Sequence, residues 1–394
     1  MDALEQLLHL GADERAERGL THTPAEIAQQ PDTWAATFEV FQQRRAEIRD
    51  FLGGTGIGTS QRERPSVFLI GAGTSDYVGR SLEQLLRRLW QTEVIAVPST
   101  DLLTREREHL IAGKQYVWIS FSRSGDSPEG VAVLENALRD HPNIHHVIVS
   151  CNKDGRMIRQ SEGQKLALPI PLGDAVNDRA LAMTSSFSNM VIFGQCLAHV
   201  FEGDDYGRTL QQIIAAAKNF LPVAADCAAL LSGRSYRKVC FVGSGPLAAV
   251  ARESALKLME LTAGETQTMW ESSLGLRHGP MAALKPEDLF VCFLSSEERV
   301  RKYELDLLSE IGRKKLVHAR VVIGSNQKAT VNGLAEHYLA PESSAPLPDE
   351  YRPAVDVIFG QLLGLFSSLR WKLKPDCPSP TGAISRVVGG IKIY

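Results

Sequence analysis

The spacing of apolar positions changes near residue 65, from a helical repeat to short runs typical of buried strands. Residues 23–51 have the repeat of two helices, the first opened by a capping box from Thr23 to Glu26 with Pro24 at its first helical position. Strand-like runs then alternate with helical stretches, and they lie at 66–71, 93–98, 116–120, 145–150, 238–243, 288–294 and 319–323. Strands that alternate with helices predict a parallel sheet covered by helices on both faces.

The same scheme runs twice along the chain. A helical stretch at 185–231 separates two series of strands, and Gly71-Ala72-Gly73 follows the first strand of one series as Gly243-Ser244-Gly245 follows that of the other. We therefore predict an α/β protein with two copies of one fold, each a three-layer αβα sandwich around a mainly parallel sheet. The expected division is an N-terminal helical segment at 1–55, a first domain at 56–222 and a second at 223–394.

The composition is that of an ordinary globular protein and argues against binding to nucleic acid or to a membrane. Its 394 residues are 44% hydrophobic and 23% charged, which fits two packed cores. The formal net charge of −3 gives no electrostatic reason to expect nucleic acid or an anionic membrane surface as a partner. No run reaches the roughly 18 apolar residues of a membrane helix. Cys240 and Cys292 lie in strand-like runs as buried free thiols, so we expect a cytoplasmic protein.

Hydroxyl side chains cluster after two of the predicted strands. The sequence SFSRSGDSPE at 120–129 follows the strand YVWI, and Gly73-Thr74-Ser75 follows the strand at 66–71. Hydroxyls and backbone N–H groups at a strand's carboxyl end can bind an anion where a helix begins, although Ser and Asp also serve as plain helix caps. A dinucleotide site would need a third glycine where Asp76 stands, and a P-loop would need GK[ST]. Because two such turns belong to one sheet, we favour phosphate binding.

The helix predicted at 246–265 carries a charged stripe. Glu253, Lys257 and Glu260 are spaced i, i+4 and i+7, which in most helices makes a solvated face with one Glu–Lys pair. Gly264 ends this helix just past Glu260, however, and the following loop holds His278 in a Gly- and Pro-rich turn. A carboxylate and a histidine suit the transfer of a proton between C1 and C2 of a sugar and the opening of its ring. Lys257 would hold Glu260 ionised or stabilise an enediolate oxygen.

These motifs resemble the sugar isomerase (SIS) family. GAGTS, SFSRSGDSPE, ARESALKLMELTAGE and RHGP occur in the order and spacing of a double SIS protein, and they resemble the isomerase half of glucosamine-6-phosphate synthase. VPSTDLLT, NDRALAMTSS, YELDLL and SRVVGGIKIY are similar to the AgaS type, known as tagatose-6-phosphate ketose/aldose isomerase or galactosamine-6-phosphate deaminase. The resemblance covers most of residues 20–394. It implies two αβα domains, often paired into homodimers, with no metal and no organic cofactor.

The resemblance also implies roles for individual residues. Glu260 would move the proton between C1 and C2, with Glu253 and Lys257 as supporting charges on the same helix. His278 would open the sugar ring, and in the synthase the equivalent histidine comes from a neighbouring subunit. The implied phosphate-binding residues are Thr74, Ser75, Ser122, Arg123, Ser124 and Ser127, and we expect weaker substrate contacts from Gly73, Ser185 and Ser186. The tail has Gly389-Gly390 where the synthase has its imine-forming lysine, and Lys392 is displaced, so imine catalysis through the tail is not expected.

The sequence therefore predicts a deaminase/isomerase that converts galactosamine 6-phosphate to tagatose 6-phosphate and ammonia. A plain aldose–ketose isomerase, or a deglycase for another phosphorylated sugar amine, would use the same proton shuttle, and substrate profiling separates them. A sugar-phosphate sensor without catalysis is a further alternative, because SIS domains also occur in regulators. Such a regulator commonly carries a helix-turn-helix segment with a basic recognition helix, which the N-terminal helices here lack.

Overall fold

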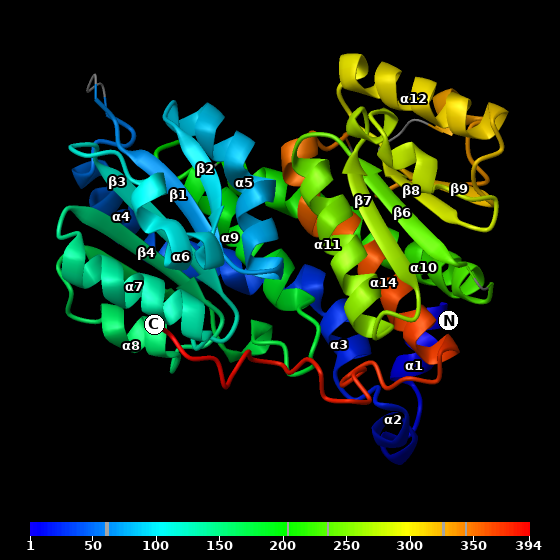
Figure 1. The fold of residues 1–394 in the computed structure, drawn as a ribbon, viewed down its shortest axis with the longest axis horizontal. Helices are drawn as coiled ribbons and strands as arrows, with labels where there is room; N and C mark the ends of the chain where they lie inside the picture. The colour runs from blue at the N-terminus through cyan, green and yellow to red at the C-terminus, as the bar shows by residue number, and fades with distance from the viewer. Residues whose placement is uncertain (60–62, 203–204, 235, 325–327, 343–344) are drawn as a thin grey trace. The chain divides into compact units, whose positions relative to one another are not determined.

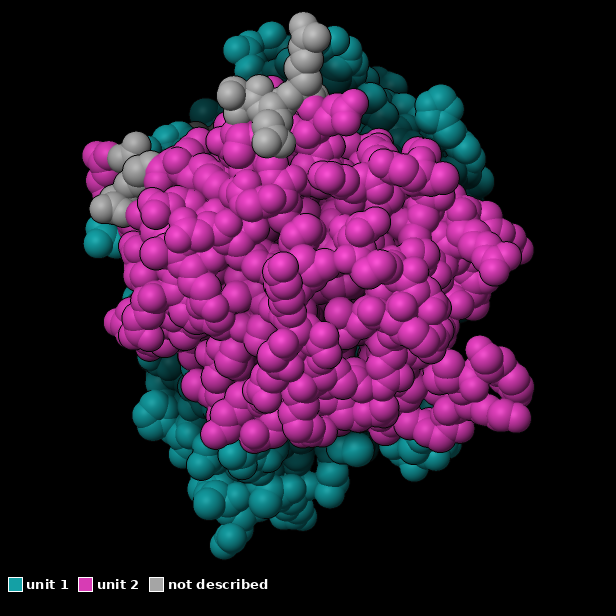
Figure 2. Space-filling model, turned by 90° about the vertical axis from the view of Figure 1, so that its left-hand side faces the viewer, with its two compact units in different colours: residues 1–31, 179–184, 209–383 teal, residues 32–178, 185–208, 384–394 magenta. Residues whose placement is uncertain are grey.

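The computed structural model describes residues 1–59, 63–202, 205–234, 236–324, 328–342 and 345–394. Figure 1 traces the chain, and Figure 2 colours its two compact units. Unit 1 comprises residues 1–31, 179–184 and 209–383, and unit 2 comprises residues 32–178, 185–208 and 384–394. The contiguous domain boundaries given above stay a prediction.

Unit 2 is built on a parallel sheet with the strand order β2-β1-β3-β4-β5. Its strands are β1 (Ser66–Gly71), β2 (Val94–Pro98), β3 (Tyr116–Ser122), β4 (Ile144–Ser150) and β5 (Ala167–Pro171). All residues of β1 and β3 are buried, as the unbroken apolar runs predict. Strand β5 is short and contains two prolines, and it was not predicted.

Helices cover both faces of this sheet, so unit 2 has the predicted three layers (Figure 1). One face carries α6 (Ser99–His109), α7 (Pro128–Asp140) and α8 (Arg156–Ser161), whose apolar side chains share two buried clusters with the strands. The other face carries α5 (Thr74–Trp90) and α9 (Ser185–Ala198), which pack on each other. Helix α4 (Gln30–Gly54) lies along α9, where Trp34 donates a hydrogen bond of 2.9 Å to Ser188. A short 3-10 helix, η1 (Asp174–Val176), precedes α9.

Unit 1 repeats this design with the strand order β7-β6-β8-β9-β10, again all parallel. Its strands are β6 (Lys238–Gly243), β7 (Gln267–Ser272), β8 (Leu289–Phe293), β9 (Ala319–Ile323) and β10 (His337–Leu339). The two sheets therefore match strand for strand, which confirms the duplicated α/β fold. Strands β7 and β10 were not predicted. Strand β7 lies at the edge, and all six of its residues are half-buried or exposed, so it lacks an apolar run.

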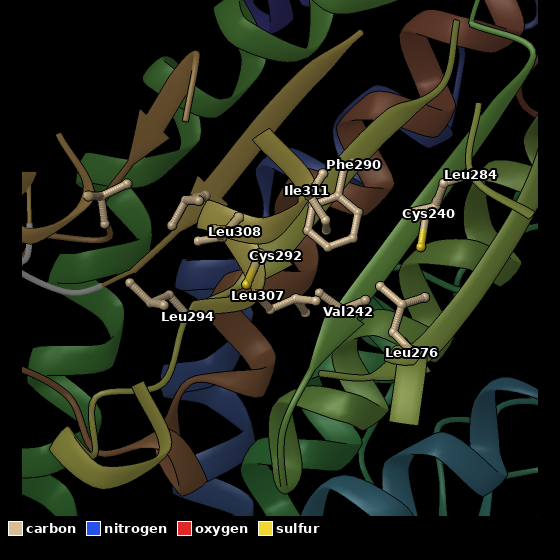
Figure 3. Close-up of a cluster of buried hydrophobic side chains, with 12 residues drawn as sticks. Cys240, Val242, Leu276, Leu284, Phe290, Cys292, Leu294, Leu307, Leu308 and Ile311 are labelled. Carbon is tan, nitrogen blue, oxygen red and sulfur yellow. The ribbon is translucent and has the colours of Figure 1, made fainter. Parts of the chain in front are cut away.

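The core of unit 1 has two sides. On one side, α12 (Glu298–Arg313) packs Leu307, Leu308 and Ile311 over Cys240 and Val242 of β6 (Figure 3). On the other side lie α11 (Pro246–Leu261) and α14 (Pro353–Arg370), which pack closely together. The remaining elements of this part of the chain are α1 (Ala3–Leu8), α2 (Ala12–Arg18), α3 (Thr23–Ala28), α10 (Asp205–Ser232), α13 (Lys328–Val331), η2 (Gly275–Arg277), η3 (Pro280–Ala283) and η4 (Asp349–Tyr351).

The predicted capping box at the start of α3 is wrong. The residue before the helix is His22, and it makes no capping hydrogen bond through its side chain. Thr23 instead donates from its hydroxyl to Asp376 at 2.8 Å, and Glu26 accepts from the backbone N–H groups of Arg179 and Ala180. Partners distant in sequence thus replace the local cap.

Within the described residues, helix α10 alone has the length and apolar composition of a membrane span, over Tyr206–Ser232. Its apolar side chains include buried residues at helical spacing, such as Ile213, Ala217, Phe220 and Ala224. An amphipathic core helix passes the same test of length and composition. The predicted absence of a membrane partner stays a prediction.

Candidate active site

We call the sheet of unit 2, which contains β1 to β5, the first sheet, and the sheet of unit 1, which contains β6 to β10, the second sheet. The two hydroxyl-rich turns follow neighbouring strands of the first sheet. β1 and β3 pair in parallel, with Ile70 opposite Ser120, so their carboxyl ends lie side by side. α5 begins after β1 at Gly73, whose φ of 56° and ψ of −124° favour glycine, and a Cβ there would meet no atom within 4 Å. α7 begins after β3 at Ser127. The structure thus brings the two predicted turns together at the sheet edge where open α/β folds bind ligands.

The serines of the second turn already organise its backbone. Ser122 accepts from Gly125 N–H at 2.9 Å, and Ser124 accepts from Asp126 N–H at 3.1 Å. Ser127 caps α7 by accepting from Gly130 N–H at 3.4 Å, so the cap interpretation is correct for this residue. A hydroxyl that accepts one hydrogen bond still has its own hydrogen to donate, so these roles are compatible with anion binding.

The hydroxyls of the first turn are at the N-terminus of α5. Thr74 and Ser75 are its first two residues, and both are buried. Helix N-termini present N–H groups and a positive partial charge to an anion. Two helix N-termini, of α5 and α7, therefore border the same strand ends.

Arg123 connects this turn to the C-terminal tail. Its side chain is buried and donates to the backbone carbonyl of Arg386. Arg386 in turn donates from Nε to the carbonyl of Asp178 at 2.7 Å and from Nη2 to the side chain of Asn177 at 2.5 Å. Arg386 belongs to the motif SRVVGGIKIY, but its role was not predictable from the sequence, because its partners lie more than two hundred residues away.

Ser185 and Ser186 are fully buried and bind a carboxylate of the protein itself. Their hydroxyls donate to the two oxygens of Asp178, each at 2.5 Å, and their backbone N–H groups donate to the same carboxylate. Asp178 thereby anchors the start of α9. A direct contact of these two hydroxyls with substrate stays a prediction, and the described geometry gives them a structural function.

The charged stripe on α11 forms as predicted, but it is not a solvated face. Glu253 and Lys257 are fully buried. The Lys257 ammonium lies 2.5 Å from Glu260 Oε2 and 3.4 Å from Glu253 Oε1. The Glu260 side chain is 23% exposed, so within the described chain solvent reaches it while its two neighbours are covered. This arrangement holds one accessible carboxylate next to a buried ammonium, which suits a base that works beside a developing negative charge.

His278 is exposed and lies on the other side of the second sheet from α11. It directly follows η2, whose Leu276 packs with Cys240 and Val242 in the cluster under α12 (Figure 3). β7 separates it from α11 along the chain. The described residues thus place Glu260 and His278 on opposite faces of one sheet, and the structure does not bring this predicted pair together within one chain.

The loop that carries His278 is fastened to α12. Arg277 donates to Glu310 at 2.8 Å and to Asp306 at 2.9 Å, both on α12. Hydrogen bonds from Lys314 and from Arg277 lower the pKa of Glu310 to about 2. Lys392 in the tail lies 4.8 Å from the centre of the Tyr394 ring, in a largely exposed stretch.

No group of three His, Cys, Asp or Glu side chains suited to a metal ion occurs in the described part of the chain. The expected absence of a metal and of an organic cofactor stays a prediction. A separate cavity of about 850 Å³ lies at the amino ends of β3 and β4, lined by Lys114, Tyr116, His141 and Ile144 among others. It contains none of the predicted site residues.

Similar proteins define the class of this fold. No protein-family model matches the chain. The solved tagatose-6-phosphate ketose/aldose isomerase from Escherichia coli superposes with a TM-score of 0.85 at 29% identity, covering 94% of this chain and 96% of that one. The C-terminal domain of glucosamine-fructose-6-phosphate aminotransferase from Francisella tularensis superposes with a TM-score of 0.76 at 18% identity, covering 94% and 100%. The fold is therefore that of a double SIS-domain protein.

Sequence relatives narrow the class to one family. D-galactosamine-6-phosphate deaminase AgaS from Escherichia coli is 31% identical over 375 residues, which are 95% of this chain and 96% of the relative. The protein of that name from Shewanella sp. is 31% identical over 390 residues, covering 98% and 95%. The chain belongs to the AgaS family of enzymes, as the motifs predicted.

Proposed function

We propose that this chain is an amino-sugar-phosphate deaminase that converts galactosamine 6-phosphate to tagatose 6-phosphate and ammonia. The observation that carries the proposal is the Glu260 carboxylate, accessible to solvent and paired with buried Lys257, in a chain of the AgaS family. Both the relatives' names and the site chemistry support this activity, whereas fold alone would not. The cytoplasmic location expected from the cysteines suits a catabolic enzyme of this kind.

The reaction begins on the open-chain sugar, which has an aldehyde at C1 and an amine at C2. Glu260 removes the proton from C2, the electron pair forms a C1=C2 double bond, and the C1 oxygen takes up a proton from water, which gives an enaminol. The protonated Glu260 returns its proton to C1, and the nitrogen loses a proton to water, which leaves a ketimine at C2. Water adds to this imine and ammonia leaves, so the product is the ketose. Lys257 stabilises the negative charge that develops on the C1 oxygen.

The phosphate at C6 binds at the carboxyl ends of β1 and β3. Thr74, Ser75, Ser122 and Ser124 supply hydroxyls, the N-termini of α5 and α7 supply N–H groups, and Arg123 supplies a positive charge. Gly73 leaves open space above the first turn. An anchored phosphate positions the reacting carbons without taking part in the chemistry.

We propose further that the active form is a homodimer in which His278 of one chain opens the ring of a sugar bound with Glu260 of the other. The placement of these two residues on opposite faces of the second sheet supports this arrangement. The edge strand β7 and its surroundings also expose large apolar side chains: Met259 at 45%, Trp270 at 36% and Leu274 at 44%. An exposed edge strand with apolar neighbours suits an interface with a second copy.

Ammonia release from galactosamine 6-phosphate tests the proposed activity. Replacing Glu260 by Gln removes the base and is expected to lower kcat by about 10²–10⁴-fold, the usual contribution of general acid–base catalysis. Glu265→Gln is a matched control, because this exposed glutamate lies five residues further on and outside the stripe. Near-normal turnover by the Glu260 variant would contradict the assigned role.

A plain ketose/aldose isomerase is the second candidate, favoured by the name of the solved Escherichia coli relative. Its substrate would carry a hydroxyl at C2 in place of the amine, and the same carboxylate would move the same proton. A panel of hexose and hexosamine 6-phosphates separates the two activities. Ammonia release from the amines supports the deaminase, and ketose formation from the hydroxy sugars alone supports the isomerase.

A further inference from the structure

The second sheet repeats the strand-end geometry of the first. Gly73 precedes α5 with φ and ψ of 56° and −124°, and Gly245 precedes α11 with 56° and −129°. These glycines follow β1 and β6, which hold the same place in their sheets, between an edge strand and the third strand of each series. Matched backbones at matched positions should create a strand-end anion site in each sheet.

In the second sheet a carboxylate of the protein is bound at the strand ends. Glu304 on α12 accepts at Oε1 from the hydroxyls of Ser244 at 2.7 Å and Ser273 at 3.0 Å, and at Oε2 from the backbone N–H of Ser295 at 2.7 Å. The three donors follow β6, β7 and β8, which are neighbours in the sheet. The Glu304 side chain is fully buried. Three strand ends thus donate to one anion.

We infer that Glu304 is a built-in anion that fills, in the second sheet, the site which the first sheet keeps open for a phosphate. The assignment of phosphate to the first sheet rests on the proposed function, whereas the filled site in the second does not. Each chain should therefore bind one sugar phosphate, although its fold is duplicated.

Charged side chains of the protein also bind the carboxyl ends of β8 and β9. Fully buried Arg352 donates to the carbonyls of Leu294 and Ile323, at the ends of β8 and β9, and to Asp349 and Asp356. Burial raises the pKa of Glu304 despite its three hydrogen bonds. Removing the Glu304 carboxylate would leave its three hydrogen-bond donors without an acceptor in a buried site. A small anion bound in the same space would accept their hydrogen bonds.

Chemical rescue tests the inference. Glu304→Ala removes the carboxylate and the methylene next to it, so acetate matches the missing atoms. The thermal midpoint of this variant should rise by several degrees in about 100 mM acetate, compared with chloride at equal ionic strength, because a ligand that binds only the folded state stabilises it. Wild type and Glu298→Ala, an exposed carboxylate on the same helix, should show no such difference. An equal response in all three proteins would overturn the inference.

Two further measurements cover the other outcomes. If Glu304→Ala does not fold, refolding with acetate should recover folded protein where chloride does not, and equal recovery would overturn the inference. For the wild type, native mass spectrometry with galactosamine 6-phosphate should show one ligand per chain, and two per chain would overturn it. No binding of the sugar phosphate would instead contradict the proposed function, and the acetate response would still decide the role of Glu304.

Discussion

Complementation between two inactive variants decides whether Glu260 and His278 act from different chains. Glu260→Gln and His278→Ala each remove one group, and each homodimer is expected to lose about 10²-fold or more of its activity. In a heterodimer of the two variants, one site lacks both groups and the other has both, provided that each site draws on both chains. The purified heterodimer should then have about half of the wild-type activity, and a random mixture, in which about half of the dimers are mixed, about one quarter.

The assay uses two affinity tags and coexpression, so that tandem purification yields the heterodimer alone. A second heterodimer, of wild type with a chain that carries both substitutions, makes the test symmetrical. If the two groups act from different chains, this second species has no intact site and is inactive. If they act within one chain, it retains about half of the activity and the first species is inactive. The second pattern would refute the argument from opposite faces of the sheet.

Two other predictions concern stability and substrate affinity. His146 is buried against Trp118, its ring nitrogens have no hydrogen-bond partner among the described residues, and burial lowers its pKa from 6.5 to about 4. The neutral His146 ring therefore contributes to the free energy of unfolding above pH 6.5, and this contribution is lost as the pH falls towards 4. The loss is about 2 kcal/mol between pH 7 and pH 5. Over this range the free energy of unfolding of His146→Leu, measured with denaturant, should fall by about 2 kcal/mol less than that of the wild type. Arg386→Ala should release the tail from Asp178 and displace Arg123, raising KM for the sugar phosphate several-fold with kcat little changed, and Arg386→Lys should recover part of the affinity. Equal falls in kcat and kcat/KM would contradict a role in holding Arg123.

The sequence was sufficient for elements whose pattern is local and strong. Strands such as β1 and β3 are buried along their whole length, so their apolar runs predict them directly. β7 has no buried residue and was missed, since an edge strand without a covered face has no apolar pattern to read. The same limit explains the wrong capping box, because the choice between a local cap and a distant partner such as Asp376 depends on tertiary structure.

In the candidate site, too, contacts within one helix were predictable and contacts between distant segments were not. Helical spacing alone brought Glu253, Lys257 and Glu260 together, and the structure adds their burial and their distances. Arg386 and Glu304 were missed, because each meets its partners from a segment far along the chain. From the sequence, the hydroxyls of Ser185 and Ser186 were expected to contact substrate. In the structure both donate to Asp178, seven and eight residues earlier in the chain.

The duplicated fold has two equivalent sets of strand carboxyl ends, one in each sheet. The proposed reaction needs a phosphate site and a base, so the two sets need different side chains. A phosphate bound at C6 holds a hexose by the end opposite to C1 and C2, so hydroxyls and helix N-termini can position the sugar but offer no base for its reacting carbons. The first sheet has hydroxyls and N–H groups at its strand ends, and the second has Glu304 there and a carboxylate–ammonium pair on α11. Filling the second anion site with a side chain prevents a second phosphate from competing for the chain. It also fixes Ser273, five residues before His278, to α12, so one buried carboxylate both closes a site and holds the loop of the proposed ring-opening residue.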